Sequence, residues 1–136
     1  RLQEYQIPIE TIHDGSFLSP EVLSVPLNSF ANEPFIILRS DNDTGKRALT
    51  ICQENNFTPH TIFRLDQQMT AYNIACSGMG ITFIGDLLLA SAPATSELIF
   101  YKLPGKNCNR NVSFYWKKGR YISRAMEEFL KIALPQ

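Results

Sequence analysis

Side chains that can bind a ligand are concentrated in one short polar segment: Ser40, Asp41, Asn42, Asp43 and Thr44. The segment follows the unbroken apolar run at 34–38 and precedes residues 46–56, whose apolar positions have helical spacing. Backbone N–H groups at a helix N-terminus are free to donate and carry partial positive charge, which suits a carboxylate or a phosphate. We therefore predict that the segment binds a small ligand, although its two aspartates disfavour a strongly anionic one. The alternative is that these residues only turn the chain and cap the helix through Asp43 or Thr44.

Two further segments are candidate contacts for the same ligand. Gln67 and Gln68 begin a predicted helix directly after a predicted strand, in the same sequence context as the first segment. Ser77, Gly78 and Met79 belong to a glycine-containing turn between a predicted helix and the next strand, and glycine lets the backbone approach a ligand closely. The alternatives are helix capping at Gln67 and Gln68 and a helix C-cap at Ser77 to Met79.

The residues that most often perform catalysis do not form a recognisable constellation. His13 lies in a turn-rich loop and His60 opens a predicted strand, and neither adjoins a nucleophile motif or a set of residues with metal-ligand spacing. Cys52 and Cys76 fall on apolar helix faces and are predicted to be small core residues, whereas Cys108 lies in a polar turn. We expect no enzymatic activity, no metal and no cofactor.

Composition is typical of a folded domain that does not itself attract nucleic acid. The chain has 136 residues, of which 44% are apolar and 19% charged, and its formal net charge is zero. Lysine and arginine are not in excess over aspartate and glutamate, so the composition predicts no electrostatic attraction to DNA. The three cysteines are widely separated, which fits a reducing compartment better than a disulfide framework. No apolar stretch approaches the roughly 20 residues of a membrane span, so no membrane association is expected.

Alternating strands and helices predict an α/β domain with a mostly parallel sheet. Helix 67–77 is expected to be capped by Asp66, and Asn56 to end helix 46–56 in a left-handed conformation. A helical turn is expected at 23–31. The predicted strands are 6–12, 34–38, 60–65, 81–85, 97–103 and 111–118. The predicted helices are 46–56, 67–77, 86–91 and 122–134.

The order of these elements resembles the effector-binding domain of LysR-type transcriptional regulators. Pro34-Phe35-Ile36 matches the start of the family's second lobe, and Ala75-Cys76-Ser77-Gly78-Met79-Gly80-Ile81 matches its helix-to-strand turn. The closing helix matches through Ser123, Ala125 and Phe129. No single motif is specific, but their order and spacing together are. The resemblance begins near residue 5 and extends over nearly the whole chain.

The resemblance implies a fold like that of type 2 periplasmic binding proteins, with two lobes of mainly parallel sheet. The expected division is a crossover strand and remnant of lobe I at 1–12, a complete lobe II at 13–103, and a return to a partial lobe I with the C-terminal helix at 104–136. Most of the first lobe and the DNA-binding domain are then expected to be outside the sequence.

The function implied is that of a cytoplasmic bacterial sensor. A small-molecule effector would bind in the cleft between lobes and control promoter binding by a helix-turn-helix domain outside this chain, in a homodimer or homotetramer. The alternative is an extracytoplasmic solute-binding receptor of a transporter, which has the same fold.

Overall fold

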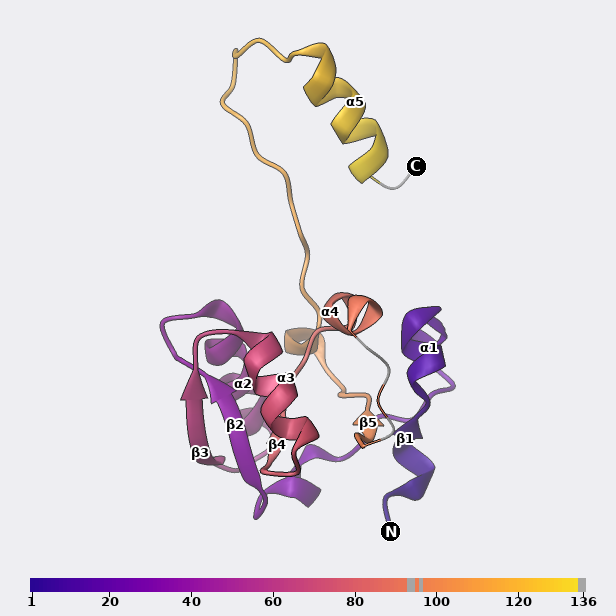
Figure 1. The fold of residues 1–136 in the computed structure, drawn as a ribbon, viewed down its shortest axis with the longest axis vertical. Coiled ribbons are helices and arrows are strands. Elements are labelled where there is room, and N and C mark those ends of the chain that lie inside the picture. Colours follow the sequence, from indigo (N-terminus) through magenta and orange to yellow (C-terminus); the bar gives the residue numbers. More distant parts are fainter. Residues whose placement is uncertain (93–94, 96, 135–136) are drawn as a thin grey trace.

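A computed structural model describes residues 1–92, 95 and 97–134, and its arrangement is drawn in Figure 1. Residues 1–92, 95 and 97–110 form a packed body, and residues 111–134, which we call the C-terminal arm, extend away from it. The body is built on a parallel sheet with the strand order β3–β2–β4. Its strands are β2 (Pro34–Leu38), β3 (His60–Leu65) and β4 (Ile81–Thr82). The α/β class and the parallel sheet predicted from the sequence are confirmed.

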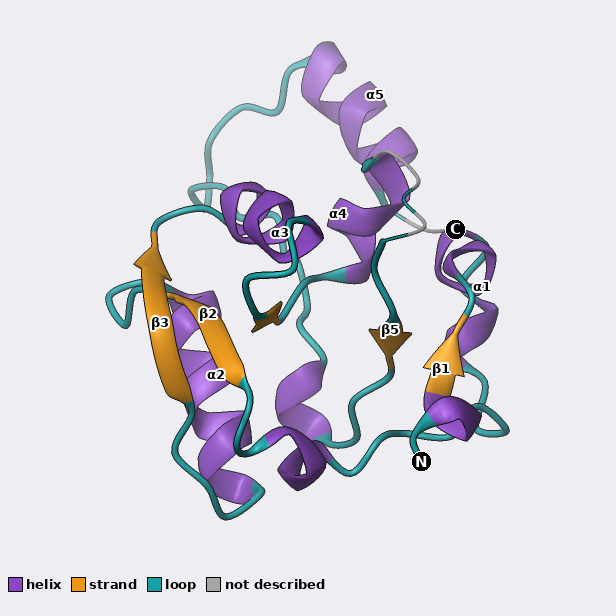
Figure 2. Cartoon of the chain, turned by 60° about the horizontal axis from the view of Figure 1, so that its bottom comes forward, coloured by secondary structure: helices purple, strands orange, loops and turns teal. Residues whose placement is uncertain are grey.

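The central strand β2 is buried because helices cover both of its faces (Figure 2). Successive side chains of a strand point to opposite faces. Phe35 and Ile37 accordingly pack with Ala48 of α2 (Asp43–Glu54). Ile36 and Leu38 pack on the other face with the alanines of α3 (Gln68–Cys76). The unbroken apolar run is thus explained by burial on two sides.

Helix α2 begins three residues earlier than the sequence predicted, and its cap is different. Asn42 has extended backbone, and its side-chain oxygen accepts a hydrogen bond from the Thr44 N–H at 2.8 Å. The expectation that Asp43 or Thr44 caps the helix is therefore wrong. Asn56 has φ of 62°, as predicted for the residue that ends this helix.

Helix α3 is preceded by Gln67, whose side chain makes no capping hydrogen bond, so Asp66 is not the cap that was predicted. The sequence places Cys76 on an apolar face of this helix, and the structure confirms that face. Tyr72 is buried in a cluster with Ile12 and Leu89, and Met69 and Cys76 pack against that cluster.

A second sheet pairs the N-terminal segment with a late strand. β1 (Gln6–Ile7) is antiparallel to β5 (Phe100–Tyr101). The predicted strand 6–12 ends early, because Pro8 precedes a helix, α1 (Ile9–His13), instead of continuing the strand. The strands predicted at 81–85 and 97–103 are also shorter than expected, two residues each.

Short helical segments complete the body. The helical turn expected at 23–31 is the 3₁₀ helix η3 (Leu27–Phe30), which Pro26 precedes. The predicted helix 86–91 is confirmed as α4 (Asp86–Ser91). The remaining segments are η1 (Gln3–Tyr5), η2 (Ser16–Leu18) and η4 (Lys106–Cys108).

The C-terminal arm contains an extended segment and one helix, α5 (Arg124–Ala133). Ser123 caps α5 by accepting a hydrogen bond from the Met126 N–H at 3.2 Å, so the predicted helix is confirmed. The strand predicted at 111–118 is wrong, since none of these residues has strand pairing. Every residue from 111 to 121 is exposed. The arm therefore has a regular helix but no packed surroundings within the described chain.

Candidate functional site

The loops that follow β2, β3 and β4, of which the first two are polar, all lie at one edge of the parallel sheet, which we call the rim (Figure 1). Parallel strands end on the same side, and ligands of open α/β sheets bind outside those ends. The helices α2, α3 and α4 begin at the rim, so their N-terminal N–H groups are directed toward it. The rim is therefore the part of the body that offers the most favourable hydrogen-bonding groups to a small polar ligand.

The loop after β2 is held very close to the strand by Gly45. A Cβ added at Gly45 would lie 2.2 Å from the Arg39 carbonyl oxygen and 2.4 Å from that of Leu38. Only a residue without a side chain permits this approach. The segment 39–42, which we call the rim loop, is consequently fixed between the end of β2 and the first turn of α2.

Gln68 connects three of the loops at the rim. Its side-chain amide donates to the Thr44 hydroxyl oxygen at 3.1 Å, and its side-chain oxygen accepts from the Gly85 N–H at 3.4 Å. The first turns of α2 and α3 and the start of α4 are thereby joined through side-chain hydrogen bonds. Thr44 and Gln68, both predicted from the sequence, are brought together by the fold.

Arg110 is a residue of the rim that sequence reasoning missed. Its Nη1 donates to the Thr44 hydroxyl oxygen at 3.3 Å and lies 3.7 Å from Oδ2 of Asp43. Asp43 also accepts a hydrogen bond from Arg47 at 2.8 Å. The Arg47 hydrogen bond lowers the pKa of Asp43 below its ordinary value, and the charges of Arg47 and Arg110 lower it further. A residue 66 positions from Thr44 carries no local signal of this contact.

Ser40 and Asp41 face a separate part of the rim, beside β3. With Arg39 and Arg64 they line an open hollow of about 410 Å³. Arg39 Nε lies 3.7 Å from Asp41 Oδ1 and 3.6 Å from Asp66 Oδ1. The predicted segment 40–44 is thus divided, with Ser40 and Asp41 toward β3 and Thr44 toward α3 and α4.

Ser77, Gly78 and Met79 are not at the rim. They follow the end of α3, whereas Gln68 begins it. A Cβ on the neighbouring Gly80 would lie 2.8 Å from the carbonyl oxygen of Pro34, the first residue of β2. Ser77 donates to the Ile74 carbonyl at 2.6 Å, and Gly78 has φ of 78°, so these residues end the helix. The fold separates them from Thr44 and Gln68 by the length of α3.

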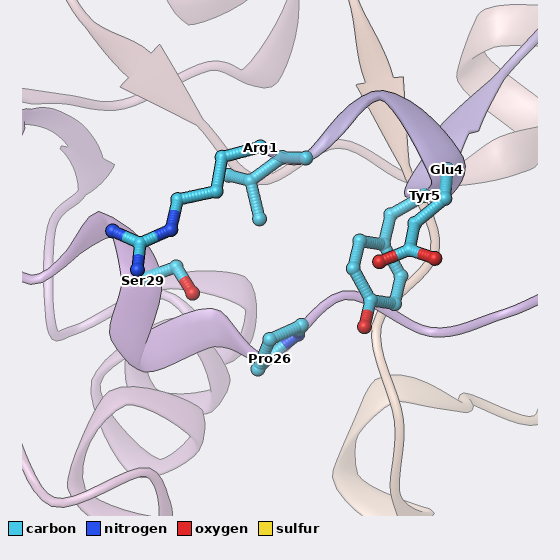
Figure 3. Close-up of a pocket in the computed structure, with 6 residues that line it drawn as sticks. Arg1, Glu4, Tyr5, Pro26 and Ser29 are labelled. Atoms are coloured by element: carbon cyan, nitrogen blue, oxygen red, sulfur yellow. The ribbon is translucent and has the colours of Figure 1, made fainter.

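A second hollow, of about 440 Å³, lies near the N-terminus of the chain (Figure 3). Its lining residues are Arg1, Leu2, Glu4, Tyr5, Pro26 and Ser29. Pro26 and Ser29 precede β2, so this hollow lies toward the amino end of that strand, away from the rim. Its residues include none of those predicted from the sequence to bind a ligand.

The groups that most often perform catalysis have structural surroundings. A ring nitrogen of His13 lies 3.2 Å from the Leu89 carbonyl oxygen, and His60 is exposed at the start of β3. Burial raises the pKa of the Cys52 thiol to about 11, which disfavours the reactive thiolate. Within residues 1–92, 95 and 97–134, no three His, Cys, Asp or Glu side chains gather closely enough to hold a metal ion.

Cys108 is more enclosed than its polar sequence context predicted. Its thiol lies 3.0 Å from the Pro104 carbonyl oxygen and packs against the cluster that contains Cys52. Burial, and then the charge of Glu54, raise the pKa of the Cys108 thiol. None of the helices in the described part of the chain has the length and hydrophobicity required to cross a membrane.

These features define a class of protein: an α/β ligand-binding domain with polar loops gathered at the ends of its parallel strands. Comparison with known proteins identifies the family. The family model of the LysR substrate binding domain matches residues 17–136, so the chain belongs to this family. Its fold is accordingly that of type 2 periplasmic binding proteins. The family is a ligand-binding domain of transcriptional regulators, not a class of enzymes.

Relatives of the chain include two proteins from Bacillus subtilis (strain 168). The uncharacterized HTH-type transcriptional regulator YcgK is 26% identical over 110 residues, which are 80% of this chain and 33% of the relative. The uncharacterized HTH-type transcriptional regulator YybE is 26% identical over 106 residues, 78% of this chain and 35% of the relative. The chain therefore spans about a third of the length of these relatives. No solved structure matches it significantly.

Proposed function

We propose that this chain is the effector-sensing part of a bacterial transcriptional regulator and binds a small-molecule inducer at the rim. The observation that carries the proposal is the network of Thr44, Gln68, Gly85 and Arg110. It gathers donors and acceptors from three segments that follow parallel strands and from Arg110, which follows η4. Family membership and the names of the relatives support the regulatory role.

The ligand suited to these groups is a small polar molecule with at least one acidic group. Arg110 and the first N–H groups of α2 favour negative charge, while Asp41, Asp43 and Asp66 oppose more than a modest amount of it. Arg39 and Arg47 balance these three carboxylates. Gln67 is exposed at the same edge and is available for a further contact.

The regulatory step is a shift between conformations. An effector changes the equilibrium only if it binds one arrangement of the protein better than the other. In this proposal the polypeptide outside the chain supplies a helix-turn-helix domain and most of the first lobe. Residues 13–103 are the second lobe, 1–12 are the crossover strand and a remnant of the first lobe, and 104–136 return to the first lobe. The assembly is a cytoplasmic homodimer or homotetramer that binds promoter DNA.

A ligand screen with matched variants tests the site. The protein is heated with a panel of small carboxylates, amino acids and phosphorylated metabolites, and a ligand that binds the native state raises the melting temperature. Thr44→Val removes the hydroxyl that accepts from Gln68 and Arg110. We expect it to weaken binding about tenfold, the equivalent of one hydrogen bond. Thr50→Val, farther along the same helix, is the control.

Equal affinities in Thr44→Val and the wild type would contradict the site. The regulatory role has a separate test, which is promoter binding by the full-length protein with and without the ligand that the screen identifies. Promoter affinity that is unchanged by a ligand bound at the rim would contradict it. Failure of the full-length protein to bind DNA at all would favour the solute-receptor alternative.

A further inference from the structure

Two adjacent residues, Asn109 and Arg110, form the end of the body just before the C-terminal arm and contact the first turns of α2. Arg47 Nη1 donates to the Asn109 carbonyl oxygen at 3.2 Å. Arg110 Nη1 donates to Thr44 and lies within ion-pair distance of Asp43. These contacts, which we call the tie, are long-range in sequence, 62 positions for Arg47 and Asn109 and 66 for Thr44 and Arg110.

The tie lies at the boundary between packed and unpacked chain. Just before it, η4 is attached to α2, because Asn107 donates to Glu54 and Cys108 packs against the cluster that contains Ile51. Just after it, every residue from 111 to 121 is exposed. The tie therefore decides where the arm leaves the body and in which direction it starts.

Thr44 and Asp43 belong both to the tie and to the rim. The Thr44 hydroxyl oxygen accepts from Gln68 as well as Arg110, which uses both of its acceptor positions. A ligand group that donates to Thr44 must displace one of these partners. A ligand carboxylate near Asp43 competes for the Arg110 guanidinium. In both cases occupancy of the rim changes the contacts of Arg110.

The tie is weak enough to be exchanged. The Arg110 and Asp43 side chains are 52% and 63% exposed, so water and salt screen their attraction. Asp43 keeps the shorter contact to Arg47 when Arg110 departs, so its charge is not left without a partner. From these contacts we propose that the tie couples the rim to the arm, so that a change at Thr44 or Asp43 alters the mobility of residues 109–111. This inference rests on the proposed function of the rim.

Backbone relaxation measured by NMR tests the coupling without a ligand. Amide order parameters are close to 0.85 in rigid backbone and below about 0.6 in flexible segments. We expect the wild-type amides at positions 109–111 to be near the rigid value. Arg110→Gln should lower them toward the flexible value, and Thr44→Val and Asp43→Asn should lower them by smaller amounts. Lys46→Gln, which removes an exposed charge from the same helix, should leave them unchanged.

Unchanged order parameters at 109–111 in Arg110→Gln would overturn the tie. A fall in Arg110→Gln that neither Thr44→Val nor Asp43→Asn reproduces would overturn the coupling to the rim. All of these positions are exposed or half-buried, and a thermal melt of each variant confirms that the body stays folded. No ligand is used, so the result is independent of the effector screen. Coupling without any effector and an effector without coupling are therefore distinguishable outcomes.

Discussion

Helices α2 and α5 have the same local design, but only α2 is packed. Each is amphipathic and each begins with a side-chain cap, Asn42 in one and Ser123 in the other. The apolar stripe of α2 is buried against β2 and η4, whereas Phe129 and Ile132 of α5 are 53% and 86% exposed. The difference shows that a helix is specified by its own residues, while its stabilisation in the fold comes from its partners.

Substitution of one phenylalanine in each region gives the largest expected contrast. Phe35 is buried and packs against the rings of Phe57 and Phe83 at 5.8 and 5.9 Å. Phe35→Ala should lower the free energy of unfolding by about 3–5 kcal/mol. Phe129 is 53% exposed and packs edge to face with Phe114, with ring centroids 5.5 Å apart, so Phe129→Ala should cost less than about 1 kcal/mol. Urea denaturation measures both, and equal losses would mean that the arm is packed in solution.

Glycine substitutions should also affect the stability of the body more than that of the arm, but the difference in the free energy of unfolding should be smaller. Gly→Ala inside a helix ordinarily stabilises it by about 1 kcal/mol. Gly45→Ala should instead cost about 2–3 kcal/mol, because the new methyl group meets two backbone carbonyl oxygens. At Gly119 a Cβ has open space but φ is 75°, so strain is confined to the arm. Thermal unfolding of the body should be unchanged in Gly119→Ala, and a stabilised Gly45→Ala would refute the close approach.

Removal of the helix caps should have a still smaller effect. Only removal of the α2 cap, which lies in the body, should lower the free energy of unfolding of the body. Asn42→Ala should reduce the free energy of unfolding by about 1 kcal/mol. Ser123→Ala removes the equivalent hydrogen bond from α5 and should lower helix content by circular dichroism without moving the unfolding midpoint of the body. A shift of that midpoint by Ser123→Ala would show that α5 contributes to the folded body.

The smallest expected effect is a difference in thiol reactivity between a buried cysteine of the body and an exposed cysteine of the arm. Cys52 has a pKa raised to about 11 by burial, so at pH 8 it should react with iodoacetamide only after local opening. A cysteine introduced by Ser113→Cys, at an exposed position of the arm, should react as a free thiol. Peptide mapping distinguishes the two. The raised pKa also makes the free energy of unfolding depend on pH, because the folded state holds the Cys52 thiol proton more tightly than the unfolded chain does. This contribution to stability is fully present below pH 9 and is lost as the pH rises through about 11.

Sequence reasoning succeeded where a local pattern sufficed. The apolar run 34–38 and the strand 60–65 were predicted with their observed bounds, and Asn56 was identified as the residue that ends α2. Residues 111–118 alternate as a strand does, yet a strand requires a neighbour for its hydrogen bonds, and none pairs with them in the described structure. A sequence pattern therefore indicates a propensity and does not provide the partner.

In the candidate site, too, the residues with a local sequence signal were predicted and the residue with a long-range contact was not. Ser40 to Thr44 and Gln68 were predicted because each follows a strand and opens a helix. Arg110 was missed, because its contact with Thr44 depends on how distant segments are placed. Ser77 to Met79 were grouped with the others because of their glycine-containing turn, and the fold places them beyond the far end of α3. Whether Gln68 and Ser40 contact an effector stays a prediction.

The close approach of Gly45 to β2 restricts how this family of sites can diversify. Only four residues, 39–42, connect β2 to α2, and the glycine leaves no slack between the two elements. An insertion or deletion there would displace the helix as a whole, along with its capping group. Under the proposed function, new effector preferences at the rim loop would therefore arise from exchange of side chains and not from changes in loop length. A library for engineering altered specificity should randomise residue identities here and keep the number of residues constant.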